Sequence, residues 1–337
     1  MSINVSIEDG RLLSVLSAGL PLVERPFAAI GESLGMAENE VVGRIAALKE
    51  AGVVGHLGAV FDSRGLGYRS SLVAFRVAPG REDEAAEVIG RHPGVTHVYG
   101  RPHAFNVWAT LAVAPTSALG LDRTAEALGR DAQAEATRLL PALALYKVGV
   151  KLDQPDRGEP GEPPAPEAIG LIRELQKDLP LVPSPYAEVG GRLGIGEDQV
   201  LASARQMVEA GRLRRVAAVV QGRPGGLRAS AMGVFAVPEE RIDEVADAVS
   251  NSAAVSHCYR RPVYPDWPYA LFTMVQGRTA EECEATLEAL SKAAAAPEYA
   301  ALPTTKAYKR ARLEYFSPEA EAWEAAVLER ARASGEA

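Results

Sequence analysis

The sequence is poor in cysteine and in long apolar runs. Cys258 and Cys283 are the only two cysteines among 337 residues, and neither belongs to a CxxC pair or a haem-attachment motif. This scarcity excludes a disulfide scaffold and a structural zinc site. No uncharged apolar stretch reaches the ~20 residues of a membrane-spanning helix, and the first residues lack the basic and then apolar order of a secretion signal. We therefore expect a cytoplasmic protein without a membrane segment.

Positive charge is also in the minority. The chain has 36 Lys and Arg against 44 Asp and Glu, which gives a formal net charge of −8. An acidic chain binds nucleic acid only through a local basic face, so the sum argues against nucleic acid as the partner without excluding it.

The length and one polar segment divide the chain in two. At the usual ~100–200 residues per domain, 337 residues predict two or more packed cores. Residues 153–166 are rich in proline, glycine and glutamate and have almost nothing to bury, which is typical of an extended linker. This linker lies close to the middle of the sequence.

The two halves on either side of the linker repeat one another. The stretch 42–52 matches 201–211, the string 94–102 matches 254–262, and 144–147 matches 306–309. Because the offset hardly changes along the half, these matches indicate an internal duplication. Each half of the sequence is therefore expected to form one structural unit.

Each half begins with three short helical segments. Apolar spacing predicts helices at 7–17, 26–34 and 38–51, and again at 167–177, 185–193 and 197–210. Gly52 and Gly211 can supply left-handed C-caps. A strand pair is expected behind each third helix, starting in the first half at 53–61, so each module is predicted to be a winged helix-turn-helix.

Each half then continues in the order strand, helix, strand, strand, helix, strand. We place these elements at 67–78, 81–91, 95–101, 104–114, 117–131 and 143–151, and again at 227–237, 239–251, 254–261, 268–277, 279–294 and 304–315. A capping box, Thr279-x-x-Glu282, opens the last of these helices. The order is that of a ferredoxin-like βαββαβ domain.

The predicted fold class is therefore α+β, as a tandem duplication. The two sheets are expected to cover each other, which makes an intramolecular pseudo-dimer with a cavity or groove between related faces. The expected domains are 1–62 and 167–222 (winged helix-turn-helix), 63–152 and 223–316 (ferredoxin-like), the linker 153–166, and a C-terminal helix at 317–337.

A winged helix followed by such a domain resembles the Lrp/AsnC type of transcription regulator, so DNA is the first partner to consider. The candidate recognition helix at 38–50 has two cations and three anions, and its counterpart opens with Glu197 and Asp198. Carboxylates repel the phosphate backbone, so nucleic acid is not the favoured partner. A basic cluster follows the second helix, at Arg212, Arg214 and Arg215. It fits either a solvated wing edge or a DNA contact.

One string of chemically useful residues occurs in both halves. His97, Tyr99 and Arg101 alternate along a predicted strand, and the second half repeats them as His257, Tyr259 and Arg261, each arginine being followed by proline. Alternation sends each trio to one face of its sheet. An imidazole can ligate iron or move a proton, and a guanidinium can hold a carboxylate. A purely structural role also fits, because duplication copies structural residues too.

The segments after the two strings are more specific. The first half continues HAFNVWATL from His103, and the second continues VYPDWPYALFTM from Val263. These segments resemble the signature segments of the paired subunits of siroheme decarboxylase, in a form where the two subunits are fused. The resemblance implies loss of the carboxyl groups of the C12 and C18 acetates of siroheme, to give 12,18-didecarboxysiroheme and carbon dioxide in alternative haem or haem d1 biosynthesis.

The resemblance also implies a site for a flat ring with eight carboxylates. Cations that can hold them are Arg69, Arg101, Arg228, Arg260 and Arg261, and apolar or aromatic walls can come from Tyr99, Phe105, Trp108, Tyr259, Trp267, Tyr269 and Phe272. No cofactor is expected beyond the iron tetrapyrrole substrate, because the ring is its own electron sink and the sequence has neither a nucleotide-binding glycine pattern nor a metal-ligand cluster.

Decarboxylation leaves electron density on a methylene carbon, so the reaction needs a proton donor. We hypothesise that His103 or His257 is this acid. His97 is the alternative, either as the donor or as an axial ligand of the siroheme iron. The halves differ here, since His103 has no histidine counterpart and Gly100 aligns with Arg260. One or two productive pockets therefore remain open.

Two alternative functions and the oligomeric state stay open at this point. A tetrapyrrole-responsive DNA-binding regulator and an inert tetrapyrrole carrier are the alternative functions. A further homo-oligomer of the pseudo-dimer is also possible from the sequence.

Overall fold

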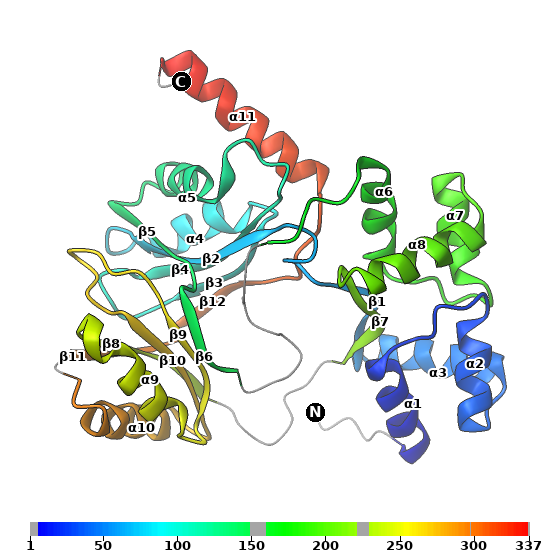
Figure 1. The fold of residues 1–337 in the computed structure, drawn as a ribbon, viewed down its shortest axis with the longest axis horizontal. Helices are drawn as coiled ribbons and strands as arrows, with labels where there is room; N and C mark the ends of the chain where they lie inside the picture. The colour runs from blue at the N-terminus through cyan, green and yellow to red at the C-terminus, as the bar shows by residue number, and fades with distance from the viewer. Residues whose placement is uncertain (1–5, 149–159, 221–228, 297, 336–337) are drawn as a thin grey trace. The chain divides into compact units, whose positions relative to one another are not determined.

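A computed structural model describes residues 6–148, 160–220, 229–296 and 298–335. It divides the chain into two compact units, and each unit combines parts of both sequence halves. One unit contains both sets of N-terminal helices (Met1–Tyr68, Pro160–Arg223 and Glu314–Ser317), and the other contains both sheets (Arg69–Glu159, Pro224–Leu313 and Pro318–Ala337). The predicted α+β class and the duplication are confirmed (Figure 1). The bounds of the six segments expected from the sequence stay a prediction.

The helical unit contains two copies of a three-helix module. The first copy is α1 (Ile7–Ala18), α2 (Pro26–Leu34) and α3 (Glu38–Glu50); the second is α6 (Pro166–Leu175), α7 (Pro185–Leu193) and α8 (Glu197–Glu209). Behind each third helix a glycine is left-handed, with φ 70° at Gly52 and 68° at Gly211. The absence of a Cβ makes this conformation cheap, so both predicted C-caps are confirmed.

The strand pair of this unit differs from the expectation. Among the described residues, each half supplies one strand to this unit, β1 (Val54–Phe61) or β7 (Leu213–Val220), and these two strands pair antiparallel with each other. The prediction of a strand pair within each half is therefore wrong. Alternating apolar residues mark a strand, but they do not say which strand will be its neighbour.

The other unit contains two five-stranded sheets (Figure 1). The first has the order β12-β3-β4-β2-β5 and the second β11-β8-β10-β9-β6. The strands of the first half are β2 (Arg69–Arg76), β3 (Val95–Gly100), β4 (Val107–Val113), β5 (Ala136–Leu140) and β6 (Ala144–Val148). Those of the second half are β8 (Ala229–Ala236), β9 (Val255–Arg260), β10 (Leu271–Gly277), β11 (Glu298–Pro303) and β12 (Lys306–Arg310).

Helices cover the outer face of each sheet. The first sheet packs on α4 (Glu82–Gly90) and α5 (Gly120–Asp131), and the second on α9 (Ile242–Ser250) and α10 (Ala280–Ala293). Thr279 caps α10 as predicted, because its Oγ1 accepts a hydrogen bond of 3.2 Å from the backbone N–H of Glu282.

Two strands are exchanged between the sheets. β6, from the first half, pairs with β9 of the second sheet, and β12, from the second half, pairs with β3 of the first sheet. The segments 143–151 and 304–315 were expected to be the fourth strands of their own sheets, which is wrong. β5 and β11 take that place, pairing with β2 and β8. Both are short, and nothing in the local sequence shows the exchange.

The inner faces of the two sheets pack against each other. Trp108 from β4 and Trp267 from the segment before β10 lie in the centre of this contact, with 1% and 0% of their surface exposed and ring centroids 5.2 Å apart. Each sheet also sends one arginine to the other. Arg101 Nη1 donates to the Leu302 carbonyl of β11 at 2.6 Å, and Arg261 Nη1 donates to the Leu140 carbonyl of β5. Apolar contact and polar bonds, including this matching pair, therefore join the two halves of the pseudo-dimer.

The remaining expectations can be stated briefly. The C-terminal helix is α11 (Pro318–Ser334), which packs on α5 through Val327. Residues 153–159 of the predicted linker lie outside the described residues, and its last residue, Pro166, begins α6. Both cysteines are buried and neither forms a disulfide. In the part of the chain that the structure describes, no helix has the length and apolarity to cross a membrane.

Candidate active site on the inner sheet faces

Each inner face carries the predicted histidine, tyrosine and arginine in one line. On the first sheet, His97 stacks on Tyr99 with ring centroids 5.8 Å apart, and the Arg101 Cζ lies 5.5 Å from the centre of the Tyr99 ring. The second sheet repeats this arrangement with His257 on Tyr259 at 6.2 Å and with Arg261 at 5.1 Å from the Tyr259 ring. The face alternation predicted from the sequence is confirmed.

The neighbouring hydroxyl fixes each of these imidazoles. His97 Nδ1 lies 3.0 Å from Thr96 Oγ1, and His257 Nδ1 lies 3.0 Å from Ser256 Oγ. Burial lowers the pKa of His97, and the charge of Arg310 lowers it further. A neutral imidazole whose Nδ1 is held by a second group is the form that ligates a metal through Nε2.

His103 lies in a different environment, among side chains of the second half. Its ring contacts Trp267 at 5.1 Å and Tyr269 at 6.3 Å between centroids, and its Nδ1 accepts a hydrogen bond of 3.1 Å from the Phe105 N–H. Burial lowers the pKa of His103; Arg76 lowers it further and Glu298 opposes the shift. The structure therefore brings His103 to Trp267 and Tyr269, whereas His97 and His257 stack on their own tyrosines.

Glu298 is a polar group beside this histidine. It accepts a hydrogen bond of 2.7 Å from the Tyr269 hydroxyl, and it raises the pKa of Tyr269 to about 12 together with burial, which is the larger cause. The raised pKa keeps the proton on the Tyr269 hydroxyl, which donates it in the hydrogen bond to Glu298.

On the first sheet, the position that corresponds to Glu298 is Ala136, which has no carboxylate. The register places Arg76 opposite Ala136 there, whereas on the second sheet Ala236 stands opposite Glu298. Asp266, from the segment after Arg261, bridges Arg76 at 2.9 Å and Arg138 at 2.8 Å. On the first sheet, an ion-pair network of Arg76, Arg138 and Asp266 thus occupies this place. On the second sheet, Glu298 lies beside His103.

The predicted aromatic walls lie deep between the sheets. Phe105, Trp108, Trp267 and Phe272 have at most 2% of their surface exposed, and Tyr269 has 6%. They form one cluster with Ala74, Leu140 and Leu302. In this structure they are core residues of the sheet contact, and their contact with substrate stays a prediction.

Two of the predicted cations lie away from the inner faces. Arg260 stands opposite Leu271, which belongs to the helix-covered core of the second sheet, and it forms an ion pair with Glu239. Arg69 is exposed at the start of β2, and Arg228 lies outside the described residues. Their roles in binding stay predictions.

The sequence analysis missed Arg310. This residue stands directly opposite His97 in the pairing of β12 with β3, and its Cζ lies 5.6 Å from the centre of the Tyr99 ring. The basic run Lys-Ala-Tyr-Lys-Arg at 306–310 was a signal, but its strand was assigned to the other sheet.

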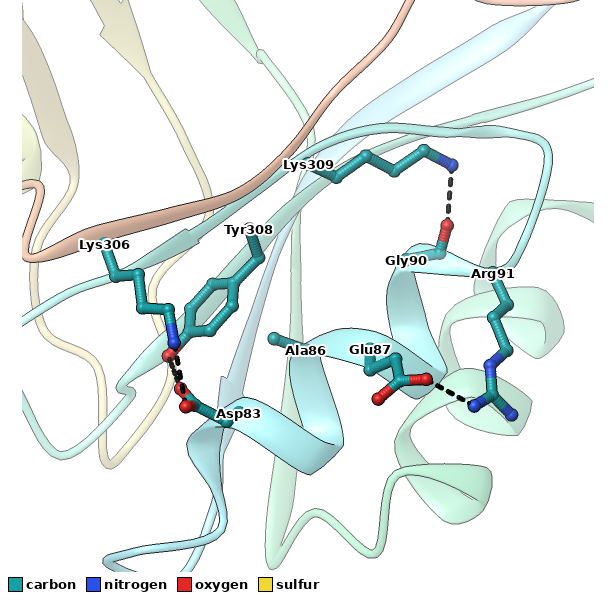
Figure 2. Close-up of a pocket in the computed structure, with 8 residues that line it drawn as sticks. All are labelled: Asp83, Ala86, Glu87, Gly90, Arg91, Lys306, Tyr308 and Lys309. Carbon is teal, nitrogen blue, oxygen red and sulfur yellow. Dashed lines mark hydrogen bonds and ion pairs between the residues drawn. The ribbon is translucent and has the colours of Figure 1, made fainter.

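A cavity of about 430 Å³ lies elsewhere, between α4 and β12 (Figure 2). Its charged side chains are matched to one another, with Lys306 on Asp83 at 2.8 Å and Arg91 on Glu87 at 2.6 Å. The Lys309 ammonium donates to the Gly90 carbonyl at 2.6 Å. Matched charges of this kind offer little to a polyanionic ligand.

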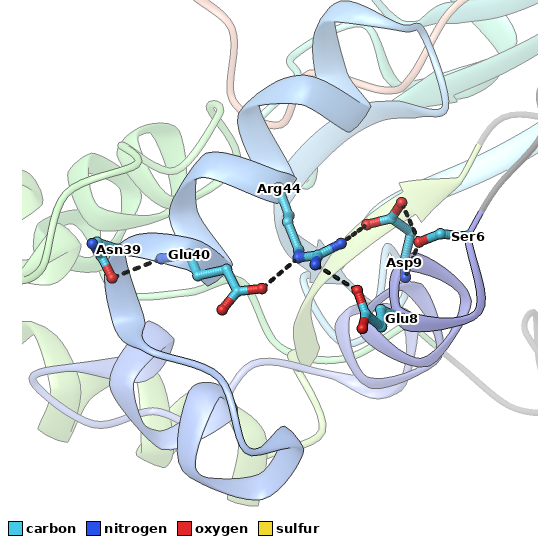
Figure 3. Close-up of polar contacts among 6 residues, drawn as sticks. All are labelled: Ser6, Glu8, Asp9, Asn39, Glu40 and Arg44. Atoms are coloured by element: carbon cyan, nitrogen blue, oxygen red, sulfur yellow. Dashed lines mark hydrogen bonds and ion pairs between the residues drawn. The ribbon is translucent and has the colours of Figure 1, made fainter.

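Internal ion pairs also neutralise helix α3, the candidate recognition helix. Arg44 contacts Glu8, Asp9 and Glu40 at 2.5, 3.1 and 2.9 Å (Figure 3). Lys49 forms an ion pair of 2.6 Å with Asp178. Both cations of α3 are therefore engaged by carboxylates of the same unit.

The basic cluster after α8 is partly neutralised as well. Arg214 pairs with Asp62 of the first half at 2.8 Å, and Arg212 donates to the Glu162 carbonyl.

Among the described residues, no group of three or more His, Cys, Asp or Glu is arranged to hold a metal ion.

Comparison with known proteins gives the same two family models in each half. The AsnC-like ligand binding domain matches residues 65–147 and 225–309, and the siroheme decarboxylase NirDL-like HTH domain matches residues 9–54 and 169–214. A siroheme decarboxylase of Hydrogenobacter thermophilus is 34% identical over 325 residues, which cover 94% of this chain and 97% of the relative. The chain belongs to the siroheme decarboxylase family.

Other siroheme decarboxylases agree with this assignment. The NirDL subunit of the Paracoccus denitrificans enzyme is 34% identical over 306 residues, covering 88% of this chain and 91% of the relative. The crystal structure of the siroheme decarboxylase NirDL in co-complex with an iron-uroporphyrin III analogue is 32% identical, with a TM-score of 0.80 over 96% of this chain and 99% of that chain. The fused two-half form expected from the sequence is confirmed.

Proposed function

We propose that this siroheme decarboxylase removes the carboxyl groups of the C12 and C18 acetates of siroheme, releasing 12,18-didecarboxysiroheme and two molecules of carbon dioxide. The observation that carries the proposal is the 34% identity to a siroheme decarboxylase over 94% of the chain. The doubled His-x-Tyr-x-Arg-Pro strings on the inner sheet faces support it. The iron tetrapyrrole is the substrate, and the reaction uses no separate cofactor.

The binding step depends on cations at fixed positions. Siroheme carries eight carboxylates, so several guanidinium groups are needed to hold and orient the ring. An arginine on the departing carboxylate would stabilise the reactant more than the transition state. The arginines of the inner faces are therefore assigned to the carboxylates that stay on the ring.

The chemical step breaks the bond between the carboxyl carbon and the methylene carbon of the acetate. The electron pair remains on the methylene carbon and is shared with the conjugated ring. One proton per carbon dioxide then converts the methylene into a methyl group. His103 is the proposed donor, because it is half-buried and lies beside Tyr269 and Glu298. His257 is the second candidate.

The protonation state of His103 fits a donor once the substrate is bound. In the free protein burial keeps the pKa of His103 below its ordinary value, so the ring is neutral at neutral pH. The carboxylates of siroheme favour the imidazolium form, and binding therefore promotes proton uptake by the histidine. His97, with its Nδ1 held by Thr96, is the proposed axial ligand of the substrate iron.

The helical modules are proposed to be scaffolding. The two cations of α3 are engaged in internal ion pairs, and α8 opens with two acidic residues. A helix of this charge faces repulsion from a phosphate backbone.

One experiment distinguishes the enzyme from a tetrapyrrole-responsive regulator. Purified protein is mixed with siroheme without oxygen, and the tetrapyrrole is recovered for mass spectrometry. Loss of two carboxyl groups is the expected result. Spectral binding without loss of mass, combined with salt-sensitive binding to duplex DNA, would contradict the enzyme and favour the regulator.

A further inference from the structure

Arg310 occupies a special position because of the strand exchange. It belongs to the second half of the sequence, but β12 carries it to the edge of the first sheet, opposite His97. Side chains that face each other across an antiparallel pair have Cβ atoms about 5 Å apart. The two side chains are therefore close enough to contact the same ligand.

The equivalent position on the second sheet lacks a cation. β6 pairs with β9 in the same register, and there Val148 stands opposite His257. The strands that pair with the other edge of β3 and β9 also differ in polarity. Polar Thr110 stands opposite His97, and apolar Met274 stands opposite His257. The residues paired with the histidine are thus an arginine and a threonine on the first sheet, and a valine and a methionine on the second.

The other arginines of the inner faces already have partners. Arg101 and Arg261 bond to carbonyl groups of the opposite sheet. Arg76 and Arg138 share the carboxylate of Asp266. Arg310 is exposed, and among the described residues no hydrogen-bond acceptor or carboxylate binds its guanidinium, which only lies over the Tyr99 ring.

We propose that Arg310, opposite His97 on the first sheet, forms a carboxylate-binding subsite that receives one carboxylate of the tetrapyrrole. At the position that matches Arg310, the described part of the second sheet has Val148 instead, so the ring is held in one orientation although the fold is nearly symmetric. The inference rests on the proposed function for the identity of the ligand. Arg310 is a binding and positioning residue in this proposal, and it takes no part in proton transfer.

The test compares Arg310→Ala with the wild-type full-length protein. Affinity is measured from the absorption change of iron-uroporphyrin III and of siroheme on binding, and turnover is measured at saturating siroheme. Loss of one charge-assisted bond at a partly exposed site should weaken both affinities roughly 10-fold. Turnover at saturation should change less than about 3-fold, because the carboxylate is held equally before and during the reaction.

Two further variants make the result specific. Arg310→Lys keeps the charge and should recover part of the affinity. Arg91→Ala removes an arginine from an exposed pair with Glu87 on α4 and should leave affinity unchanged. Wild-type affinity in Arg310→Ala, or equal losses in Arg310→Ala and Arg91→Ala, would overturn the subsite.

The outcomes also separate the subsite from the function. If the wild-type protein decarboxylates siroheme and Arg310→Ala binds it normally, the subsite is wrong and the function stands. If the wild-type protein binds both ligands without decarboxylation and Arg310→Ala weakens binding, the subsite stands and the proposed function is wrong.

Discussion

At the residue scale, the main finding is that identical strings have different surroundings. His97 and His257 share the His-x-Tyr-x-Arg-Pro pattern and the stacking on tyrosine, but only His97 faces an arginine across the strand pair. His103, which has no histidine counterpart, lies beside a tyrosine and a glutamate of the other half. Roles in proton transfer and in binding are therefore expected to differ between the halves.

His103→Ala tests the proposed proton donor. Removing a general acid should reduce turnover by roughly 10²–10⁴-fold while siroheme binding is largely retained. Turnover is followed by mass spectrometry of the product, and binding by the absorption spectrum. His257→Ala serves as the matched variant, since it removes the second candidate. Near-normal turnover in both single variants would show that neither His103 nor His257 is the general acid.

The pH dependence of the rate tests the same assignment. Burial, the largest cause, and the charge of Arg76 lower the pKa of His103 in the free protein. Because the protonated form is the donor, kcat/KM should fall as the pH rises through this lowered pKa, below the ordinary histidine value of about 6.5. The bound carboxylates raise the pKa of the same ring, so kcat should fall at a higher pH than kcat/KM does.

Both profiles are measured over the same pH range with siroheme as substrate. His103→Ala should lose the dependence in both parameters. Identical pH midpoints for kcat and kcat/KM would mean that substrate carboxylates do not act on the titrating group.

At the element scale, the sequence predicted helices and strands well and their partners poorly. The segments 26–34 and 185–193 match α2 and α7, since apolar spacing and an initial proline mark a helix locally. By contrast, β6 and β12 were assigned to the wrong sheets. Their pairing depends on contacts more than a hundred residues away, and local pattern carries no information on these contacts.

The misplaced strand explains the incomplete site prediction. His97, Tyr99 and Arg101 could be found because they alternate on one strand. Arg310 could not be joined to them, because its strand was expected in the other sheet. The buried state of Trp108 and Trp267 also depended on knowing which faces meet.

Trp108→Ala tests whether the aromatic cluster is core. Truncating a fully buried tryptophan between the sheets should lower the free energy of unfolding by about 3–5 kcal/mol. Urea unfolding followed by circular dichroism measures the change. Trp323→Ala, at a partly exposed position on α11, is the control and should cost less. If Trp108→Ala weakens siroheme binding without loss of stability, the side chain belongs to the substrate wall.

At the scale of the whole molecule, the compact units do not follow the sequence halves. Both helical modules share one ribbon, β1 with β7, and the two sheets share exchanged strands, buried aromatics and two crossing arginines. Such mutual dependence predicts that the two sheets unfold together.

Hydrogen exchange in increasing denaturant tests this cooperativity. Amides of β3 and β9 should lose protection at the same denaturant concentration, because each strand holds an exchanged edge strand from the other half. Mass spectrometry of peptides from the two strands gives the measurement. Loss of protection in β9 well before β3 would show that the sheets are independent.

The late position of β12 in the sequence has a consequence for synthesis of the protein. As the polypeptide leaves the ribosome, β3 emerges long before residues 306–310, which later cover its open edge. An uncovered edge strand can pair with strands of neighbouring nascent chains. The edge of the first sheet therefore stays open to such pairing until translation has passed β12.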